Sequence, residues 1–469
     1  MDGHAACDLA PRCLGKTGYL TVRGQNDALC FSHNGVCTWG EFAADVASFR
    51  SLIATPTHIC NMFPGRYDFM VGFAAALLND QVTVLPSSAA SEAIIAAQKG
   101  ARHTIMLGDA VSDVEIGERI TQVPRDGSSI DPAETVLALG RSNAEVHVFT
   151  SGSTKQPLKH VKNWAALAGG AALTEKILHD LGSSPGTCAI IGTTPHQHMY
   201  GLEATILTGL AFGHCVYEKT VFYPADLESA VTLARDVGFE RLVLVSSPAH
   251  LKYLEPVIVA TPQICGVVSA TAPLSSVQAS RLEARGDLPV LEIYGTTETG
   301  SLAERRTVQT DEWEPLDGFV LEEHSQGCMA NASYLPAPVL LGDAIELTSN
   351  GRFRLRGRLG DMVSIAGKRT NLAALNAILL ETKEIRDGVV LRHAKDNGDV
   401  IAVVVVLDPE AGITEAEAKT AIRREFRKHV DPIFLPKRIG FMDMLPRSKT
   451  GKITKSELRS LMRIVGINE

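Results

Sequence analysis

The chain has 469 residues, of which 45% are hydrophobic and 21% charged, and its formal net charge at pH 7 is -8. These values are typical of a globular protein with two or three domains, and the acidic balance argues against nucleic acid or an anionic membrane surface as the main partner. Its nine cysteines contain no CxxC pair, Met1 to Leu20 lack the pattern of a signal peptide, and no aliphatic run is long enough to span a bilayer, so we expect a soluble cytoplasmic protein without a disulfide framework.

The first part of the chain alternates helical and strand patterns. Thr38-Trp39-Gly40-Glu41 has the pattern of a capping box, so we expect a helix to begin near Thr38. Helical patterns follow at Ala225 to Arg235 and Ser276 to Ala284. Apolar runs predict strands at Val82 to Leu85, Thr187 to Gly192, Arg241 to Val245, Ile264 to Val268 and Val290 to Tyr294. This alternation indicates an α/β fold with largely parallel sheets.

The pattern changes after residue 340. Asn350-Gly351 lies between two short runs and predicts a β-hairpin. A compact α+β pattern then follows, with helices at 372–381, 415–429 and 455–462 and strands at 388–392, 400–407 and 439–442. We therefore predict a large domain over residues 1–357, a hinge at 358–361 and a small domain over residues 362–469.

The segment from Thr150 to Lys159 follows an apolar run and is rich in small hydroxylated residues around Gly152. Hydroxyl groups, backbone amides turned by a glycine and the charge of lysines together form a nest that suits phosphate. Taken alone, such a segment is more often an ordinary turn. Its interpretation as a phosphate loop depends on the other motifs of the chain.

A second polar motif, Tyr294 to Gly300, follows a predicted strand. A glutamate at the carboxyl end of a strand, here Glu298, is well placed to hold Mg²⁺ against phosphate oxygens. The alternative is that Glu298 caps a turn, and the local sequence does not decide between the two.

A third motif, Leu445 to Thr454, is a glycine turn with several cations near the end of the chain. Lys452 follows a glycine and precedes a predicted helix, so domain movement can deliver it to an anionic centre. A solvated surface lysine is the usual alternative. The motif does not match a Walker loop, because Ile453 occupies the position of the required Ser or Thr.

In this order and spacing, the three motifs resemble those of the adenylate-forming superfamily, which contains acyl-CoA and aryl-CoA synthetases, adenylation domains and luciferases. The resemblance covers most of the chain. It implies a large amino-terminal domain of parallel α/β sheets, a small mobile α+β carboxyl-terminal domain and an active site between them. It also implies joining of a carboxylate to AMP with release of pyrophosphate, followed by transfer of the acyl group to a thiol, with ATP and Mg²⁺ as cofactors.

The resemblance implies roles for individual residues. Thr297 contacts the α-phosphate, Glu298 holds Mg²⁺, and Asp343 with Arg358 binds the ribose hydroxyls. The ATP phosphates are assigned to Thr150, Ser151, Gly152, Ser153, Thr154 and Lys159. The adenine ring and the adjacent acyl pocket are assigned to Ala270, Thr271, Ala272, Tyr294, Gly295 and Thr296.

Three further roles concern catalysis and the thiol. Lys452 matches the lysine of the first half-reaction, and His198 in Pro195 to Gly201 matches a gate between the acyl pocket and the pantetheine tunnel. A metal site or a structural histidine is the alternative for His198. Gly367 matches a loop that turns toward the thiol donor in the second half-reaction.

The chain also departs from the superfamily pattern. Lys155 stands where glycine is usual and Leu158 where lysine is usual, so Lys159 is our choice for the cation that faces phosphate. Gly360 replaces the usual hinge carboxylate, which favours a loose hinge. Because of these departures, a non-catalytic protein that binds an acyl adenylate or a thioester is an alternative function.

The runs 159–164, 195–203 and 360–369 resemble, more narrowly, short ligases of bacterial aryl polyene and xanthomonadin pigment synthesis. This implies an aromatic acid such as a hydroxybenzoate, with the phosphopantetheine of an acyl carrier protein as the acceptor. Coenzyme A is the alternative acceptor, and a medium-chain fatty acid is the alternative substrate.

Overall fold

The computed structural model describes residues 23–55, 58–99, 104–108, 118–125, 127–150, 157–358, 362–365, 368–393, 399–447, 453 and 455–467. The chain divides into two compact units, which are described separately. Unit 1 comprises Met1–Ser269, Arg285–Leu302 and Ser333–Pro336, and unit 2 comprises Ala270–Ala284, Ala303–Ala332 and Ala337–Glu469. The hinge at 358–361 and the domain boundary that we placed there stay predictions.

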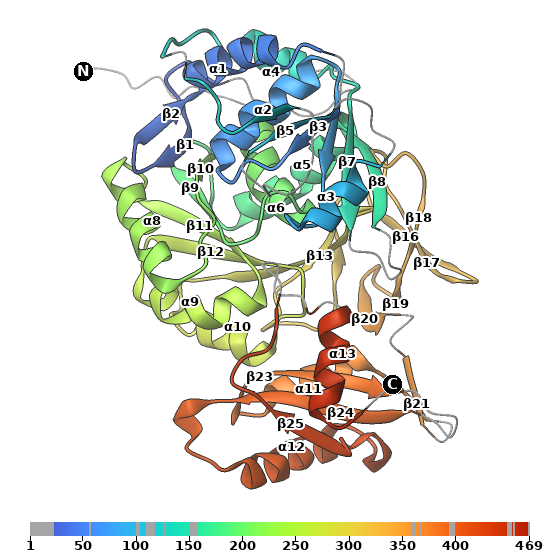
Figure 1. The fold of residues 1–469 in the computed structure, drawn as a ribbon. Coiled ribbons are helices and arrows are strands. Elements are labelled where there is room, and N and C mark those ends of the chain that lie inside the picture. The colour runs from blue at the N-terminus through green and yellow to red at the C-terminus, as the bar shows by residue number, and fades with distance from the viewer. Residues whose placement is uncertain are drawn as a thin grey trace. The chain divides into compact units, whose positions relative to one another are not determined.

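The first sheet of unit 1 has the strand order β6-β5-β3-β4-β7-β8. Its strands β3, β5, β7 and β8 are labelled in Figure 1. Its strands are parallel except β8, which runs antiparallel to β7. The strands are β3 (His58–Asn61), β4 (Val82–Leu85), β5 (Thr104–Leu107), β6 (Glu118–Ile120), β7 (Glu145–Thr150) and β8 (Leu158–Asn163). The helices that alternate with them are α2 (Arg66–Leu78), α3 (Ser91–Ala97) and α4 (Ala133–Leu139).

The second sheet of unit 1 has the order β14-β13-β12-β11-β9-β10-β1-β2. Strands β13, β12, β11, β9, β10 and β1 pair in parallel. The strands are β1 (Ala28–Ser32), β2 (Gly35–Thr38), β9 (Cys188–Gly192), β10 (Cys215–Tyr217), β11 (Arg241–Ser246), β12 (Ile264–Ser269), β13 (Val290–Thr296) and β14 (Gly300–Arg305). The helices are α1 (Trp39–Leu52), α5 (Trp164–Asp180), α6 (Met199–Gly201), the π-helix η2 (Leu202–Leu207), α7 (Thr208–Phe212), α8 (Pro224–Asp236) and α9 (Pro248–Ala260).

The expected elements of this region are confirmed. Thr38 caps α1, because its Oγ1 accepts a hydrogen bond from the Glu41 amide at 3.3 Å while Glu41 Oε2 accepts one from the Thr38 amide at 2.7 Å. Each of the five predicted strands is present, with bounds that differ by at most two residues. The alternating pattern of the sequence thus produces the expected α/β fold with largely parallel sheets.

Unit 2 begins with α10 (Ser276–Glu283) and is otherwise rich in short antiparallel pairs. The second half of β14 pairs with β15 (Glu314–Pro315). Antiparallel pairs then follow in β16 (Val320–His324), β17 (Gly327–Asn331), β18 (Val339–Leu341), β19 (Asp343–Leu347), β20 (Phe353–Arg358), β21 (Met362–Ile365) and β22 (Lys368–Asn371). The hairpin expected at Asn350-Gly351 is the β19–β20 pair.

The last part of unit 2 is a sheet of order β23-β24-β25 with three helices. Its elements are β23 (Ile385–His393), β24 (Val400–Leu407), β25 (Arg438–Phe441), α11 (Leu372–Glu381), α12 (Glu415–His429), α13 (Lys455–Ile464) and the 3₁₀ turns η4 (Pro409–Ala411) and η5 (Pro432–Phe434). This arrangement agrees with the α+β pattern expected from the sequence.

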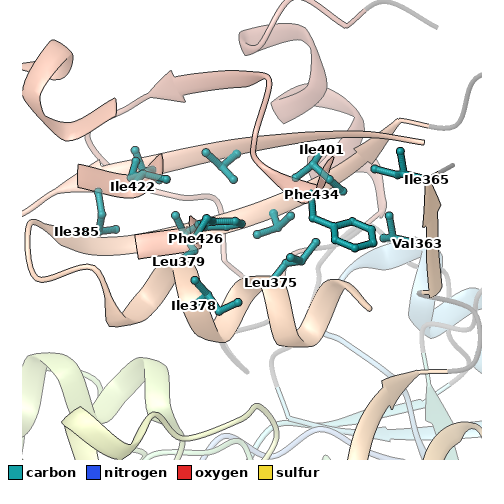
Figure 2. Close-up of a cluster of buried hydrophobic side chains, with 13 residues drawn as sticks. Val363, Ile365, Leu375, Ile378, Leu379, Ile385, Ile401, Ile422, Phe426 and Phe434 are labelled. Carbon is teal, nitrogen blue, oxygen red and sulfur yellow. The ribbon is translucent and has the colours of Figure 1, made fainter. Parts of the chain in front are cut away.

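Both faces of β24 are buried, which explains its unbroken aliphatic sequence. Ile401, Val403 and Val405 pack with α11 and α12 in the cluster of Figure 2. The alternate residues Ala402, Val404 and Val406 pack with Leu461 of α13 in a second cluster. Since successive side chains of a strand point to opposite faces, one strand supplies both cores.

Candidate active site

Strands β7 and β8 flank the predicted phosphate loop. Thr150 is the last residue of β7 and pairs with Leu158, the first residue of β8. Its Oγ1 atom lies 3.1 Å from Nε2 of His160, so the end of the loop is tied to the second strand. Ser151, Gly152, Ser153 and Thr154 lie outside the described residues, and their contacts with phosphate stay predictions.

Strand alternation separates the polar residues of β8. His160 and Lys162 share one face of the strand, and Lys162 is buried. Lys159 pairs with Phe149 and is exposed on the opposite face. Our choice of Lys159 as the cation that faces phosphate stays a prediction, and His160 and Lys162 are the basic side chains that turn toward the second motif.

The second motif forms the end of β13 and the turn that follows it. Tyr294, Gly295 and Thr296 are the last three residues of β13. The turn is closed by Thr299, whose Oγ1 accepts a hydrogen bond from the Thr296 amide at 3.2 Å. A Cβ at Gly295 would lie 2.2 Å from the carbonyl oxygen of Gly300, so this close approach requires glycine. Thr297 and Glu298 thus project from a tightly closed turn.

His160 connects the two motifs. Its Nδ1 lies 3.6 Å from Oε1 of Glu298, while its Nε2 contacts Thr150. Burial lowers the pKa of His160, although the Glu298 carboxylate opposes this shift. We did not predict His160 as a site residue from the sequence. The available signal was the spacing of His160 and Lys162, two polar residues on one face of a strand beside a phosphate loop.

The turn fits the requirements of a Mg²⁺ ligand. The side chain of Glu298 is 42% exposed, and its backbone carbonyl oxygen accepts a hydrogen bond from Nζ of Lys162. A fixed backbone with a solvent-accessible carboxylate offers an oxygen donor of the kind that Mg²⁺ prefers. The metal role of Glu298 and the phosphate role of Thr297 stay predictions.

Unit 2 brings the predicted ribose pair together. Asp343 and Arg358 are cross-strand partners in β19 and β20. The register shifts between Asp343 and Ile345, because Ile345 pairs with Leu355, so β20 contains one extra residue, a β-bulge. Gly357 lies in this bulge with φ of +95°, a conformation that favours glycine. The bulge therefore places residue 358 opposite Asp343.

The predicted adenine segment, Ala270 to Ala272, directly follows β12. Thr271 has φ of +78°, which is rare for a β-branched residue. Its Oγ1 is buried and has no hydrogen-bond partner within the described part of the chain. Backbone strain of this kind often occurs at ligand sites, and the adenine role of these residues stays a prediction.

The remaining predicted site residues are His198, Gly367 and Lys452. His198 is the N-cap residue of α6 and is partly buried. Its neighbour His196 is fully enclosed, and its Nε2 donates to the carbonyl oxygen of Phe63 at 3.0 Å. Gly367 and Lys452 lie outside the described residues. The gate, thiol and catalytic roles of His198, Gly367 and Lys452 stay predictions.

A family model supports a common origin for part of the chain. Residues 375–452 match the model of the AMP-binding enzyme C-terminal domain. The chain is 29% identical over 321 residues to a 4-coumarate–CoA ligase of Rhodobacter capsulatus, which covers 67% of this chain and 77% of the relative. It is 25% identical over 345 residues to a 4-coumarate–CoA ligase of Halorhodospira halophila, with coverage of 72% and 81%.

Solved structures share the fold. A benzoate CoA ligase from Burkholderia xenovorans aligns with a TM-score of 0.75 and 18% identity, over 93% of this chain and 97% of that chain. The O-succinylbenzoate coenzyme A synthetase from Bacillus subtilis in complex with AMP aligns with a TM-score of 0.72 and 14% identity, over 93% of this chain and 96% of that chain.

Among the described residues, none of the helices has the length and apolar character needed to cross a bilayer.

Proposed function

We propose that the chain is an adenylate-forming enzyme that couples an aromatic carboxylic acid to a phosphopantetheine thiol with consumption of ATP. The observation that carries the proposal is the contact of His160 with both Thr150 and Glu298. This contact joins the end of the predicted phosphate loop to the predicted Mg²⁺ ligand. The register of Asp343 and Arg358 in unit 2 supports a nucleotide site independently.

The first half-reaction forms an acyl adenylate. A carboxylate oxygen of the acid attacks the α-phosphorus of ATP, a new P–O bond forms, and the bond between the α-phosphorus and the bridging oxygen breaks to release pyrophosphate. Thr297, next to Glu298 in the closed turn, is assigned to the α-phosphate. Lys452 is assigned to stabilise the negative charge that spreads over the reacting phosphate, which requires no proton transfer. Glu298 would hold Mg²⁺, which would supply positive charge to neutralise the phosphate oxygens.

The second half-reaction transfers the acyl group. The sulfur of a deprotonated thiol attacks the carbonyl carbon of the adenylate, a C–S bond forms, and the bond to the AMP oxygen breaks so that AMP leaves with both electrons. The thiol proton passes to solvent. Gly367 and His198 are assigned to the path of the thiol and its gate.

The substrate part of the proposal is an aromatic acid, with a hydroxybenzoate as the best candidate. The similarity to proteins named 4-coumarate–CoA ligase and benzoate CoA ligase supports an aryl substrate. An acyl carrier protein is proposed as the donor of the phosphopantetheine thiol, on the sequence resemblance of 159–164, 195–203 and 360–369 to pigment-synthesis ligases.

The decisive experiment is ATP–pyrophosphate exchange with a panel of benzoates, cinnamates and medium-chain fatty acids. We expect exchange with benzoates, and preferred exchange with fatty acids would replace the aromatic substrate. Binding of acid and ATP without exchange for any acid would favour a non-catalytic binding protein. Transfer from the preferred adenylate should then be measured to a phosphopantetheinylated carrier protein and to coenzyme A, which separates the two acceptors.

A further inference from the structure

Side chains from three distant parts of unit 1 hold the backbone of the turn that carries Glu298. Lys162 of β8 donates from Nζ to the carbonyl oxygen of Glu298. The hydroxyl of Tyr334 donates to the carbonyl oxygen of Thr299 at 3.3 Å. Glu203 of η2 accepts hydrogen bonds from Ser301. These contacts fix the main chain and leave the Glu298 carboxylate exposed.

Glu203 is the most deeply enclosed of these groups, with 1% of its surface exposed. Its Oε2 accepts from both the amide and the hydroxyl of Ser301, each at 3.0 Å. Thr174 Oγ1 of α5 lies 3.1 Å from the same hydroxyl. One carboxyl group therefore anchors the first residues of β14 to the interior of unit 1.

The other oxygen of Glu203 lies in a space that only glycines allow. A Cβ at Gly170 would lie 2.1 Å from Oε1, and a Cβ at Gly300 would lie 2.2 Å from it. Oε1 has no hydrogen-bond partner among the residues that the structure describes. Because the carboxyl group is packed this tightly, it can shift little from Ser301.

Lys162 supplies a positive charge near the carboxyl groups of Glu203 and Glu298. It is 7% exposed, and the carboxylates of Glu203 and Glu298 act against the lowering of its pKa by burial. A buried ammonium group is costly unless it is compensated, and here it is compensated by the Glu298 carbonyl and two acidic side chains. A neutral residue of similar length would satisfy simple packing equally well, so the charge calls for another explanation.

We propose that Lys162 and Glu203 are positioning residues that hold the turn of Glu298 in the geometry that binds the magnesium complex of ATP. The inference rests on the proposed function, since it deepens the role of the Glu298 turn. Lys162 fixes the carbonyl of Glu298, and Glu203 fixes the chain three residues later. Together they set where the Glu298 carboxylate points before any ligand arrives, which lowers the cost of binding.

The test compares nucleotide binding with stability. Lys162→Met keeps the side-chain size and removes a charge. Glu203→Gln keeps the size and replaces a carboxyl group, whose pKa burial raises to about 7, by a neutral amide. We expect each to weaken binding of a non-hydrolysable ATP analogue in the presence of Mg²⁺ by about 10-fold or more, measured by calorimetry. Lys162→Met removes the charged donor to the Glu298 carbonyl, and Glu203→Gln leaves Ser301 bonded to a weaker, neutral amide oxygen. Binding without Mg²⁺ should change much less. Lys162→Arg, which keeps a cationic donor, should recover part of the loss.

Val161→Met is the matched control, because Val161 lies exposed on the other face of the same strand. It should bind the analogue like the unchanged protein. Thermal unfolding of every variant is measured in parallel. If Lys162→Met lowers the melting temperature but leaves the analogue affinity with Mg²⁺ unchanged, Lys162 is merely structural and the proposal is overturned.

Kinetics give a second readout in the active enzyme. The variants should show a raised KM for MgATP in pyrophosphate exchange, while transfer to thiol from a supplied acyl adenylate stays near the original rate. Equal loss in both half-reactions would contradict a positioning role at the magnesium turn. If no acid supports exchange even in the unchanged protein, the proposed function fails, whereas the calorimetric comparison still decides the role of Lys162 and Glu203.

Discussion

Glu203 and Ser301 are joined by two hydrogen bonds of 3.0 Å to a single carboxylate oxygen. The second oxygen of Glu203 lies against Gly170 in the middle of α5. Helix α5, the π-helix η2 and strand β14 thus meet at one buried carboxyl group. The close packing at this junction depends on Gly170, because a larger residue there would contact the carboxyl group of Glu203.

Gly170→Ala should therefore destabilise the protein. In a helix this change normally stabilises by up to about 1 kcal/mol, because alanine loses less backbone entropy than glycine. Here the new Cβ would displace the carboxyl of Glu203 from Ser301, and we expect a net loss of about 1 to 3 kcal/mol in the free energy of unfolding. Urea denaturation measures the difference.

The same substitution in a Glu203→Ala background is the control. With the carboxyl group removed, Gly170→Ala should be neutral or stabilising. If Gly170→Ala costs as much in that background as in the original protein, the contact with Glu203 is not the cause. A cost in neither background would show that the carboxyl group relaxes freely.

The sequence predicted the elements of this protein better than the contacts between them. The run Val400–Leu407 predicted β24 because β-branched residues on both faces suit a strand buried on both sides. The contact of Lys162 with Glu298, by contrast, joins residues 136 positions apart. Neither a lysine in a strand nor a glutamate after an apolar strand has a local pattern that predicts such a partner, since pairing between distant elements depends on how the sheets pack.

The site shows the same division. Thr150, Thr296 and Glu298 were predicted as site residues because polar residues at strand ends form a motif. His160 was not, since its importance comes from lying between two motifs. The pairing of Asp343 with Arg358 depends on a bulge, and a bulge cannot be read from a hairpin signal alone.

His196 should make the protein less stable in acid. Burial, assisted by the positive charge of Arg66, lowers the pKa of His196 from 6.5 to about 3. Below pH 6.5, His196 therefore binds a proton in the unfolded chain but stays neutral in the folded protein. The free energy of unfolding falls as the pH drops from 6.5 toward 3. Between pH 8 and pH 5 this amounts to roughly 2 kcal/mol.

The matching measurement is the free energy of unfolding of His196→Gln at pH 8 and pH 5. Glutamine can still donate to the Phe63 carbonyl and does not titrate, so the variant should lose about 2 kcal/mol less than the original protein on acidification. An identical acid loss with and without His196 would refute this assignment.

Arg66 should be essential for the stability of unit 1. Its guanidinium group is fully buried and donates to the carbonyl oxygens of Tyr217 at 3.1 Å, Lys219 at 2.6 Å, Gly192 at 3.1 Å and Thr194 at 3.3 Å. Arg66→Met would remove these hydrogen bonds from the buried carbonyl oxygens, and we expect a loss of about 3 kcal/mol or more, measured by urea denaturation.

Two further variants test whether the burial and the planar shape of the Arg66 guanidinium group cause this loss of stability. Arg66→Lys retains the charge but not the planar fork, so it should recover only part of the stability. Arg50→Met removes an exposed arginine and should cost no more than about 1 kcal/mol. Equal effects at positions 50 and 66 would contradict the special role of burial.

Lys452→Ala should separate the two half-reactions. By the proposed role, the variant loses pyrophosphate exchange by about 100-fold or more, because a charge aimed at the reacting phosphate is removed. Thioester formation from a supplied acyl adenylate should stay within a few-fold of the original. The role assigned to Lys452 is wrong if both rates fall together.

The bulge of β20 determines whether a variant of this chain keeps Asp343 and residue 358 as cross-strand partners. Gly357, with φ of +95°, lies in the bulge that gives β20 its extra residue. A substitution that abolished the bulge without changing the length of the chain would restore regular pairing, place Gly357 opposite Asp343 and leave residue 358 outside the pair. The chain would then retain both charged residues of the pair and still lose the pair, so an intact motif in the sequence of a variant does not guarantee an intact site.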